Sequence, residues 1–348
     1  MNKTVESKEK KIRKNGKIKV DFERTSWFER FRIKYLSLFF LKKFVWYIFR
    51  LALMIGISYV IIFPFITKIA GSFMSPDDFV DVSVKLIPKY PTLDTYKAII
   101  SENRYYEALL NTFILSFLSA VIQMFVCTLV GYGLSKFKFK GNKIVFFCVI
   151  FTMIIPHDTL MFSMFIQFRY FDIFGIYGYL HELLDLPSKY PYFNLIDTYW
   201  PLAILSIGGL ALKNGLYIFM MRQFFKGVPD ELEEAAYVDG SGVFKTFIRI
   251  ILPLSIPMMI TIFLFAFSWQ WTDTFYTTKF FTKQGLYLLP HIVEVPRSLE
   301  DANFAARSLY QSAILNTCGL MIILPLIIMY SFCQKFLVQG IERSGIVG

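Results

Sequence analysis

Six long apolar runs constrain the fold of this chain more than any other feature of its sequence. Five of the runs hold 23 to 25 mostly apolar residues and the fifth along the chain holds 16, and a helix of about twenty residues is long enough to cross the hydrocarbon layer of a bilayer. In lipid the backbone must satisfy its own hydrogen bonds, so we expect these runs to be helices. The sequence therefore predicts an all-α polytopic membrane protein with six transmembrane helices. The runs extend approximately from Phe44 to Ile66, Thr112 to Leu134, Ile144 to Phe168, Leu202 to Phe225, Ile256 to Trp271 and Ala313 to Phe336.

Composition excludes an ordinary soluble domain. Of the 348 residues, 55% are hydrophobic and 18% aromatic, and the mean hydropathy is +0.49. The net charge of +11 does not indicate a nucleic-acid-binding protein, because the basic residues gather in the N-terminal segment and in short loops, where they orient membrane helices. The four cysteines lie in apolar runs or at their edges and form no CxxC pair, which favours buried free thiols over a metal site. They are Cys127, Cys148, Cys318 and Cys333.

The basic residues also predict which side of the membrane each loop faces. The segment before the first run is rich in lysine, and the second and third runs are joined by a loop with four more lysines. Loops rich in positive charge stay in the cytoplasm. With six crossings, both termini are then cytoplasmic, and so is the loop over about residues 226–257. The four lysines are Lys136, Lys138, Lys140 and Lys143.

The chain before the first run, residues 1–43, is expected to form a region of its own. Residues 1–24 carry too little apolar material to fold alone, so they are predicted to be a disordered basic tail. Between Trp27 and Lys43, aromatic and basic residues mix in a way that suits an amphipathic helix on the membrane surface, or equally a simple extension of the first span. Residues 44–348 are expected to form the transmembrane domain.

The polar segment between the fourth and fifth runs has the residues of a bent pair of short helices. Pro229 suits the first turn of a helix, and Asp239-Gly240 ends that helix, because glycine tolerates the left-handed conformation common at helix ends. Ser241 is then placed to cap a second helix, whose apolar positions recur at helical spacing. These positions are Phe244, Phe247, Ile248 and Ile251.

The first of these two helices presents small residues beside a carboxylate. Leu232, Ala235 and Ala236 share one face, where the alanines let another surface approach closely. Glu234 stands beside that face. Such a face suits a contact with another protein. The alternative is an ordinary loop between two membrane helices.

The segment carries the pattern EAA, three residues, G, nine residues, I-x-L-P. This resembles the EAA loop of the membrane subunits of bacterial ATP-binding-cassette (ABC) importers. The wider pattern, with Phe247 and Pro257, is similar to the carbohydrate-uptake branch and in particular to its second, maltose-type permease subunit. In that family the loop couples the permease to an ATPase, and the resemblance gives this role to eight residues. They are Glu234, Ala235, Ala236, Asp239, Gly240, Phe244, Leu252 and Pro253.

The resemblance implies a permease subunit of an ATP-driven importer for an oligosaccharide or polysaccharide fragment, in the cytoplasmic membrane of a bacterium. Its implied partners are a second, different permease subunit, two ATPase subunits, an extracytoplasmic sugar-binding protein and lipid. The chain has no G-x-x-x-x-G-K-[ST] motif, so ATP and Mg²⁺ are expected on the ATPase subunits, and no catalytic residue, cofactor or metal is expected here. Three alternatives stay open: a non-transporting scaffold or sensor that recruits an ATPase, a permease for a non-sugar solute, and a proton-coupled carrier.

Polar and aromatic residues inside the runs mark a candidate substrate path. Pro156 should break the third run, and Asp158 follows it at a depth where charge is costly and often functional. Asp158 then serves either the path or helix packing, with a proton relay as the competing role. Trp269 and Trp271 are either interface anchors, which we favour, or platforms for sugar rings. Gln123 completes this set, with an interhelical hydrogen bond as its alternative role.

The connection over about residues 170–200 is longer than its counterpart in the family that the chain resembles, so we expect an inserted outer loop. Its aromatic residues either contact a sugar or an external binding protein, or form a packing lid. In the preceding outer connection a surface helix is expected around Leu93 to Ile100. The aromatic residues of the insertion are Tyr177, Tyr179, Tyr190, Tyr192 and Phe193.

Overall fold

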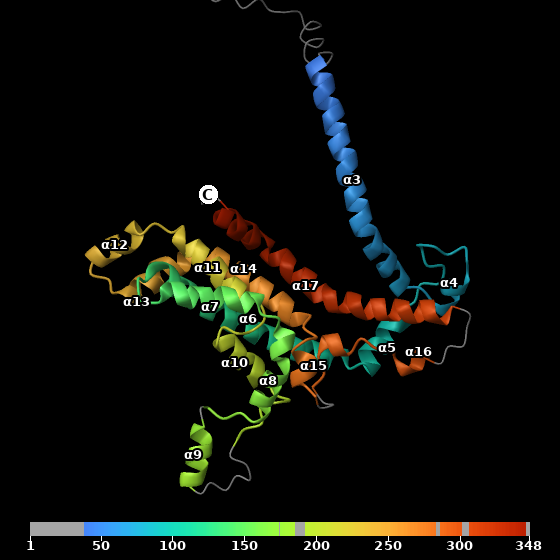
Figure 1. The fold of residues 1–348 in the computed structure, drawn as a ribbon. Helices are drawn as coiled ribbons and strands as arrows, with labels where there is room; N and C mark the ends of the chain where they lie inside the picture. The colour runs from blue at the N-terminus through green and yellow to red at the C-terminus, as the bar shows by residue number, and fades with distance from the viewer. Residues whose placement is uncertain (1–37, 174, 185–191, 283–285, 301–305, 346–348) are drawn as a thin grey trace, which may run out of the picture. The chain divides into compact units, whose positions relative to one another are not determined.

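Figure 1 shows the computed structural model of the chain, which describes residues 38–173, 175–184, 192–282, 286–300 and 306–345. Within these ranges the chain is helical, and the one β feature is an antiparallel bridge between Phe171 and Phe193. The chain divides into two compact units, residues 1–66 and residues 67–348. The predicted basic tail and most of the predicted surface helix, over residues 1–37, lie outside the described residues.

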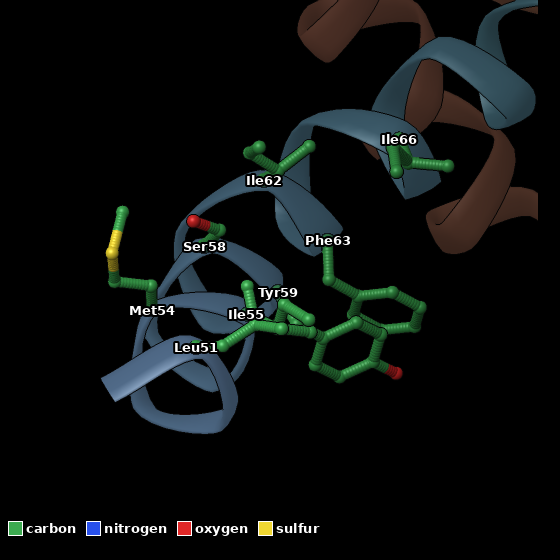
Figure 2. Close-up of a pocket in the computed structure, with 8 residues that line it drawn as sticks. All are labelled: Leu51, Met54, Ile55, Ser58, Tyr59, Ile62, Phe63 and Ile66. Atoms are coloured by element: carbon green, nitrogen blue, oxygen red, sulfur yellow. The ribbon is translucent and has the colours of Figure 1, made fainter. Parts of the chain in front are cut away.

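The first apolar run forms helix α3, Leu38–Ser72, whose residues 38–66 make up the described part of the first unit. In the most apolar window of this helix no residue is buried. Figure 2 shows eight of its side chains at helical spacing, and the rings of Tyr59 and Phe63 stack with centroids 5.1 Å apart. A helix that is apolar on every side suits lipid or another membrane subunit. The eight side chains are Leu51, Met54, Ile55, Ser58, Tyr59, Ile62, Phe63 and Ile66.

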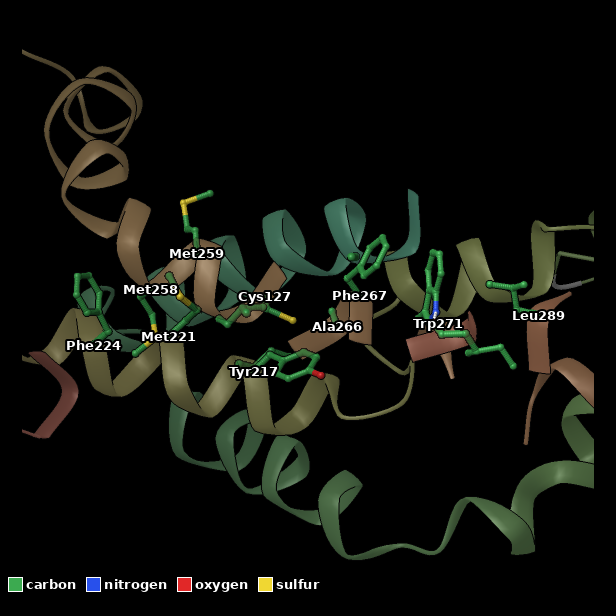
Figure 3. Close-up of a cluster of buried hydrophobic side chains, with 14 of the residues drawn as sticks. Cys127, Tyr217, Met221, Phe224, Met258, Met259, Ala266, Phe267, Trp271 and Leu289 are labelled. Atoms are coloured by element: carbon green, nitrogen blue, oxygen red, sulfur yellow. Dashed lines mark hydrogen bonds between the residues drawn. The ribbon is translucent and has the colours of Figure 1, made fainter. Parts of the chain in front are cut away.

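The second unit packs around α6, Tyr105–Lys136. Two helices, α11 (Asn214–Lys226) and α14 (Leu252–Trp271), lie along α6, and α17 (Arg307–Gly345) packs along α14. Figure 3 shows the apolar side chains buried between these helices. Because segments far apart in sequence share one core, this unit is held together by contacts between helices rather than within them. Buried members of the core include Cys127, Met221, Ile262 and Trp271.

Small residues let these helices approach closely. A Cβ atom on Gly131 of α6 would lie 2.5 Å from the Cβ of Met221 on α11, which is closer than side-chain carbons pack. A Cβ on Gly215 of α11 would lie 2.7 Å from Oγ1 of Thr152 on α7, Asn142–Ile154. Lipid gives helices little hydrophobic reason to associate, so close backbone contacts of this kind hold a membrane bundle together.

The third apolar run is broken, as Pro156 predicts. Helix α7 ends at Ile154, and α8, His157–Arg169, begins directly after Pro156. The two helices meet at 100°. Proline has no N–H to continue the helical ladder and clashes with the preceding turn. The break is confirmed, and it changes the direction of the chain rather than kinking a straight span.

The fourth run, predicted as one span from Leu202 to Phe225, is two helices. Helix α10, Trp200–Ile207, ends at Gly208, and α11 begins only at Asn214. Gly209 takes a φ of +69°, a left-handed conformation that turns the chain out of the helix. The prediction of a continuous span was wrong here, because two adjacent glycines end the helix inside an apolar run.

Four helices in the described ranges are long and apolar enough to cross a membrane, and the α7–α8 pair makes five if it is one span. The all-α polytopic fold is confirmed, while the number six stays a prediction. Among the cysteines, Cys127 and Cys318 are buried and Cys333 is half-buried. Cys148 is exposed, so the prediction of buried thiols was wrong at that position. In the part of the chain that the structure describes, no cluster of His, Cys, Asp or Glu could hold a metal ion.

Short segments gather at the two ends of the second unit. At one end, Asn103 Nδ2 donates to the carbonyl of Ile292 at 3.1 Å and so joins the connection between α3 and α6 to the connection between α14 and α17. Helix α5, Asp94–Glu102, confirms the surface helix predicted around Leu93 to Ile100. The other end carries α12, Glu231–Val238, and α13, Val243–Thr246 (Figure 1). The remaining short helices are α4 (Pro76–Val80), α5 (Asp94–Glu102), α9 (Ile176–Leu183), α15 (Thr277–Phe280), η2 (Leu289–His291) and α16 (Arg297–Glu300).

Candidate functional site

Helix α12 ends as its sequence predicts. Gly240 takes a φ of +79°, and its N–H donates to the carbonyl of Tyr237 at 3.0 Å. The N–H of Ser241 donates to the carbonyl of Ala236 at 2.9 Å. These two bonds form a Schellman motif, whose left-handed position glycine occupies without strain. The predicted stop at Asp239-Gly240 is therefore confirmed, with Asp239 as the C-cap.

Two details of the predicted helix pair were wrong. Pro229 lies before the N-cap, Asp230, and not in the first turn, because Lys136 holds the neighbouring carbonyl of Val228 outside the helix. Ser241 does not cap the second helix, which begins after Gly242 without a side-chain cap. The N–H of Ser241 closes the end of α12 instead.

The second helix of the pair continues into the helix of the fifth apolar run. Helix α13 passes through a π-helical turn, η1 (Phe247–Ile251), straight into α14, so Val243–Trp271 is one continuous helix of 29 residues. In the wide turn the N–H of Leu252 donates to the carbonyl of Phe247, five residues back. Leu252 is half-buried and Pro253 is exposed in the first turn of α14. A force on α13 therefore reaches α14 without crossing a loop.

The polar segment, here called the elbow (residues 230–246), has an inner and an outer side. The predicted common face of Leu232, Ala235 and Ala236 is divided, because Ala236 is buried and the other two residues are exposed. On α13, Phe244 is 73% exposed, whereas Phe247 just beyond it is buried. Large apolar side chains facing outward beside a carboxylate are typical of a protein-docking surface. The outer face consists of Leu232, Glu234, Ala235, Tyr237, Val238, Val243 and Phe244.

Sequence reasoning missed the contacts that hold the elbow on the bundle. Tyr132 Oη donates to Oε1 of Glu233 at 2.5 Å, and Lys136 Nζ lies 3.6 Å from Oε2 of the same carboxylate. Lys136 also donates to the carbonyl of Val228 at 2.6 Å and pairs with Asp230. The side chains of Lys136 and Glu233 are 7% and 8% exposed. A buried carboxylate that has both a cation and a hydroxyl donor is a satisfied anchor.

Asp230 extends this anchor to the surface. The hydrogen bond from Lys136 holds the pKa of Asp230 below its ordinary value, and the charge of Lys136 acts in the same direction. Asp230 stands at the N-cap of α12, where a negative charge also favours the helix. Because Lys136 ends α6, the anchor places the elbow and the basic α6–α7 loop at the same end of the bundle.

Two residues of the predicted substrate path are packing residues in this structure. Trp271 is buried, and its Nε1–H donates to the carbonyl of Ile322 on α17 at 2.9 Å. Gln123 is buried on α6, where its Nε2 lies 3.5 Å from Oγ of Ser206 on α10. Both side chains therefore connect helices.

The other two predicted path residues are accessible. Asp158 is exposed in the first turn of α8 and lines a groove of about 560 Å³ together with Lys279. Trp269 is 49% exposed near the end of α14. The Nζ of Lys213, at the break before α11, lies 4.8 Å from the centroid of the Trp269 ring. Asp158, Trp269 and Lys213 all lie at helix ends or breaks, where backbone and side chains are open to a ligand.

The connection over about residues 170–200, predicted to be an inserted outer loop, packs partly on itself. The rings of Tyr177 and Phe193 lie 4.1 Å apart, and Tyr192 meets Tyr170 at 4.9 Å. Tyr179 is 66% exposed. Tyr190, also predicted for this surface, lies outside the described residues. Whether the loop contacts a sugar or a binding protein, or acts as a lid, stays a prediction.

The comparisons with known proteins agree on one family. Residues 127–343 match the family described as "Binding-protein-dependent transport system inner membrane component". The chain is 29% identical over 264 residues to the maltodextrin transport system permease protein MdxG of Bacillus subtilis (strain 168), covering 74% of this chain and 81% of that protein. It is 26% identical over 295 residues to the polygalacturonan/rhamnogalacturonan transport system permease protein YtcP of the same organism, covering 82% and 93%.

A solved structure shares the fold. It is a bacterial ABC transporter involved in the import of the acidic polysaccharide alginate, and it matches with a TM-score of 0.61 at 20% identity. The match covers 84% of this chain and 97% of that chain.

Proposed function

The chain belongs to the family of inner-membrane components of binding-protein-dependent transport systems and is a permease subunit of a carbohydrate-uptake ABC importer, and we propose that the elbow is the surface through which partner ATPase subunits drive it. The proposed importer also contains a second, different permease subunit and an extracytoplasmic sugar-binding protein. In this proposal ATP and Mg²⁺ bind to two ATPase subunits, since the chain has no phosphate-cradling motif.

One observation carries this assignment: one side of the elbow is exposed, and its other side is attached to the helices of the bundle. Its outer face presents Phe244 and Glu234, and the carboxylate of Glu234 makes no hydrogen bond or ion pair within the described ranges. Its inner side is fixed to α6 through Glu233 and continues without interruption into α14. A surface that merely joined two membrane helices would need neither an exposed apolar face nor a buried ionic anchor.

The proposed mechanism follows from these two attachments. When the ATPase subunits close on ATP, the elbow moves with the ATPase subunit that holds it. The Glu233–Lys136 contact carries that motion to α6, and the continuous helix from Val243 carries it to α14. Because α6 and α14 are packed along each other in the core, they move as one body, and the path between the two permease subunits opens to the other side.

The positions of the basic loops support the proposed orientation. Lys136 begins the lysine-rich connection between α6 and α7, and its contacts with the elbow put both segments at one end. Positive charge marks the cytoplasmic side, where an ATPase would be met. We therefore place the elbow and both termini in the cytoplasm.

The relatives bear names of both neutral and acidic carbohydrates, maltodextrin and polygalacturonan among them. We propose an oligosaccharide or polysaccharide fragment as the transported solute.

Glu234→Lys tests the coupling role. A partly buried ion pair that loses one partner costs on the order of 3–5 kcal/mol, and a reversed charge costs at least as much. We expect this variant to insert into the membrane at the wild-type level, to retain less ATPase on purification, and to lose ATP-dependent uptake. The measurements are co-purification of the ATPase subunits and uptake of a labelled pool of neutral and acidic oligosaccharides by proteoliposomes of the complete importer.

The matched control is Glu231→Lys, which reverses an exposed charge in the first turn of the same helix. It should keep both ATPase and uptake. Wild-type uptake by Glu234→Lys would refute the coupling role. A wild-type complex that holds its ATPase and responds to ATP but moves none of the oligosaccharides would favour the scaffold or sensor alternative.

A further inference from the structure

A lysine stands at a break inside an apolar run. Lys213 lies between α10 and α11, is exposed, and takes a left-handed φ of +69°. Glycine adopts this conformation freely, whereas a residue with a Cβ atom is strained in it. Strained residues gather at functional sites, where the strained position orients a side chain.

The break lies deep in the bundle rather than at either end. The Sγ of Cys127 on α6 lies 3.8 Å from the carbonyl oxygen of Asn214, the residue after Lys213. Cys127 is nine residues from Lys136 at the end of α6, which corresponds to about 14 Å of helix. From Cys127, α6 continues in the other direction as far as Tyr105. The contact between Cys127 and Asn214 therefore lies well inside α6, which is one of the helices long and apolar enough to cross a membrane.

The charge of Lys213 has no anionic partner here. Its ammonium contacts the face of Trp269 at 4.8 Å and makes no hydrogen bond or ion pair with any residue that the structure describes. Charged residues at membrane depth pair with an opposite charge or face a water-filled path, because an unpaired charge in lipid is costly. The three N–H donors of the ammonium therefore remain available to an anion.

The surface beside this ammonium suits a sugar ring. Trp269 is 49% exposed, so its indole offers a flat apolar surface next to the positive charge. His157 interacts electrostatically with both Lys213 and Asp158, and Asp158 lines a groove together with Lys279. An apolar ring surface with a few charged groups around it is the usual composition of a small-molecule site.

We propose that Lys213 and Trp269 form a subsite for a carboxylate-bearing sugar unit, and that the importer carries acidic oligosaccharides. The sugar ring stacks on the indole while its carboxylate pairs with the Lys213 ammonium. A neutral sugar would leave that ammonium unpaired, and sites built around a polar partner strongly reject analogues that lack it. This proposal rests on the importer function and deepens it by naming the substrate class.

The test compares an acid with its uncharged ester on the complete importer. Binding of trigalacturonate and of its methyl ester is measured by titration calorimetry. The wild type should bind the acid at least about tenfold more tightly, as expected for a charge-assisted hydrogen bond at low dielectric. Lys213→Met should weaken binding of the acid about tenfold and leave the ester unchanged, Lys213→Arg should restore the acid, and Trp269→Ala should weaken both.

The matched control is Lys226→Met, an exposed lysine at the far end of α11, which should change neither ligand. Equal binding of acid and ester by the wild type, or an equal loss of both in Lys213→Met, overturns the proposal. So does a Lys213→Met variant that loses co-purified phosphatidylglycerol but keeps trigalacturonate, which would assign the lysine to a lipid headgroup. These results do not depend on ATPase coupling, which Glu234→Lys tests separately.

Discussion

Lys136 and Lys213 both stand at the end of a helix in an apolar environment, yet their surroundings are opposite. Lys136 is 7% exposed and meets Glu233, Asp230 and the carbonyl of Val228. Lys213 is exposed, its ammonium lies 4.8 Å from the ring centroid of Trp269, and it makes no hydrogen bond or ion pair with a side chain among the described residues. A satisfied charge fixes one element on another, whereas an unsatisfied charge at membrane depth indicates that its partner arrives from outside the chain.

The largest effect is expected when Lys136, the lysine whose charge is paired within the chain, is replaced. Lys136→Met leaves Glu233 buried without its cation, and breaking a buried pair costs about 3–5 kcal/mol. We expect a lower unfolding temperature in detergent and loss of ATP-driven uptake. The control Lys140→Met removes an exposed charge from the same loop and should change neither. The double variant Lys136→Met/Glu233→Gln should recover much of the stability, and its failure to do so would contradict an ionic anchor.

The next largest effect is expected at the contact between α6, which ends in Lys136, and α11, which follows Lys213. Gly131→Ala places a Cβ 2.5 Å from that of Met221, so α6 and α11 must separate. Overpacking of this kind costs about 1–3 kcal/mol. Gly133→Ala, two residues along, meets nothing closer than 4.0 Å and should be neutral or slightly stabilising. Thermal unfolding of the two variants side by side measures the difference, and equal stability would argue against the close approach.

Replacement of Lys213 is expected to change the stability in the opposite direction from replacement of Lys136. Lys213→Gly relieves the left-handed backbone and should raise the free energy of unfolding by about 1 kcal/mol, while it removes binding of acidic sugar. Lys226→Gly, in the ordinary helical backbone of α11, should lower the stability instead. A destabilised Lys213→Gly variant would show that the lysine serves the fold.

The smallest effect on stability is expected at Asp230, the exposed residue that pairs with Lys136. Asp230→Asn removes a surface pair with Lys136, and such pairs contribute little in water. Since the pKa of Asp230 is lowered in the folded chain, its contribution is present above the unfolded pKa of about 3.9 and is lost as the pH falls through the folded value. Unfolding temperatures of wild type and variant should therefore be close at neutral pH and converge further in acid. A large difference at neutral pH would assign the anchor to Asp230 rather than to Glu233.

Local signals predicted much of this fold. The apolar runs gave the helices, Pro156 gave the break between α7 and α8, and Asp239-Gly240 gave the end of α12. Each of these features depends on neighbouring residues alone, through hydropathy, a missing N–H or a left-handed glycine.

The remaining features depend on contacts between distant segments. Three glutamates stand in the first turn of α12, and only packing against Tyr132 selects Glu233 as the buried one. Gly208-Gly209 was a visible signal for the break before α11, but an apolar run of that length masks it. The pairing of Lys213 with Trp269 joins residues on two helices, so no local pattern predicts it.

The wide turn at Phe247–Ile251 has a mechanical consequence for the elbow. A π-helical turn holds one residue more than an α-helical turn, and successive residues of an α-helix are rotated by about 100°. If the wide turn gives up one residue to the regular α-helix, α13 rotates by about that angle relative to α14. The helix stays continuous during this change. The elbow can therefore rotate α14 about its axis as well as push along it, and the direction in which Phe244 points reports the size of that rotation.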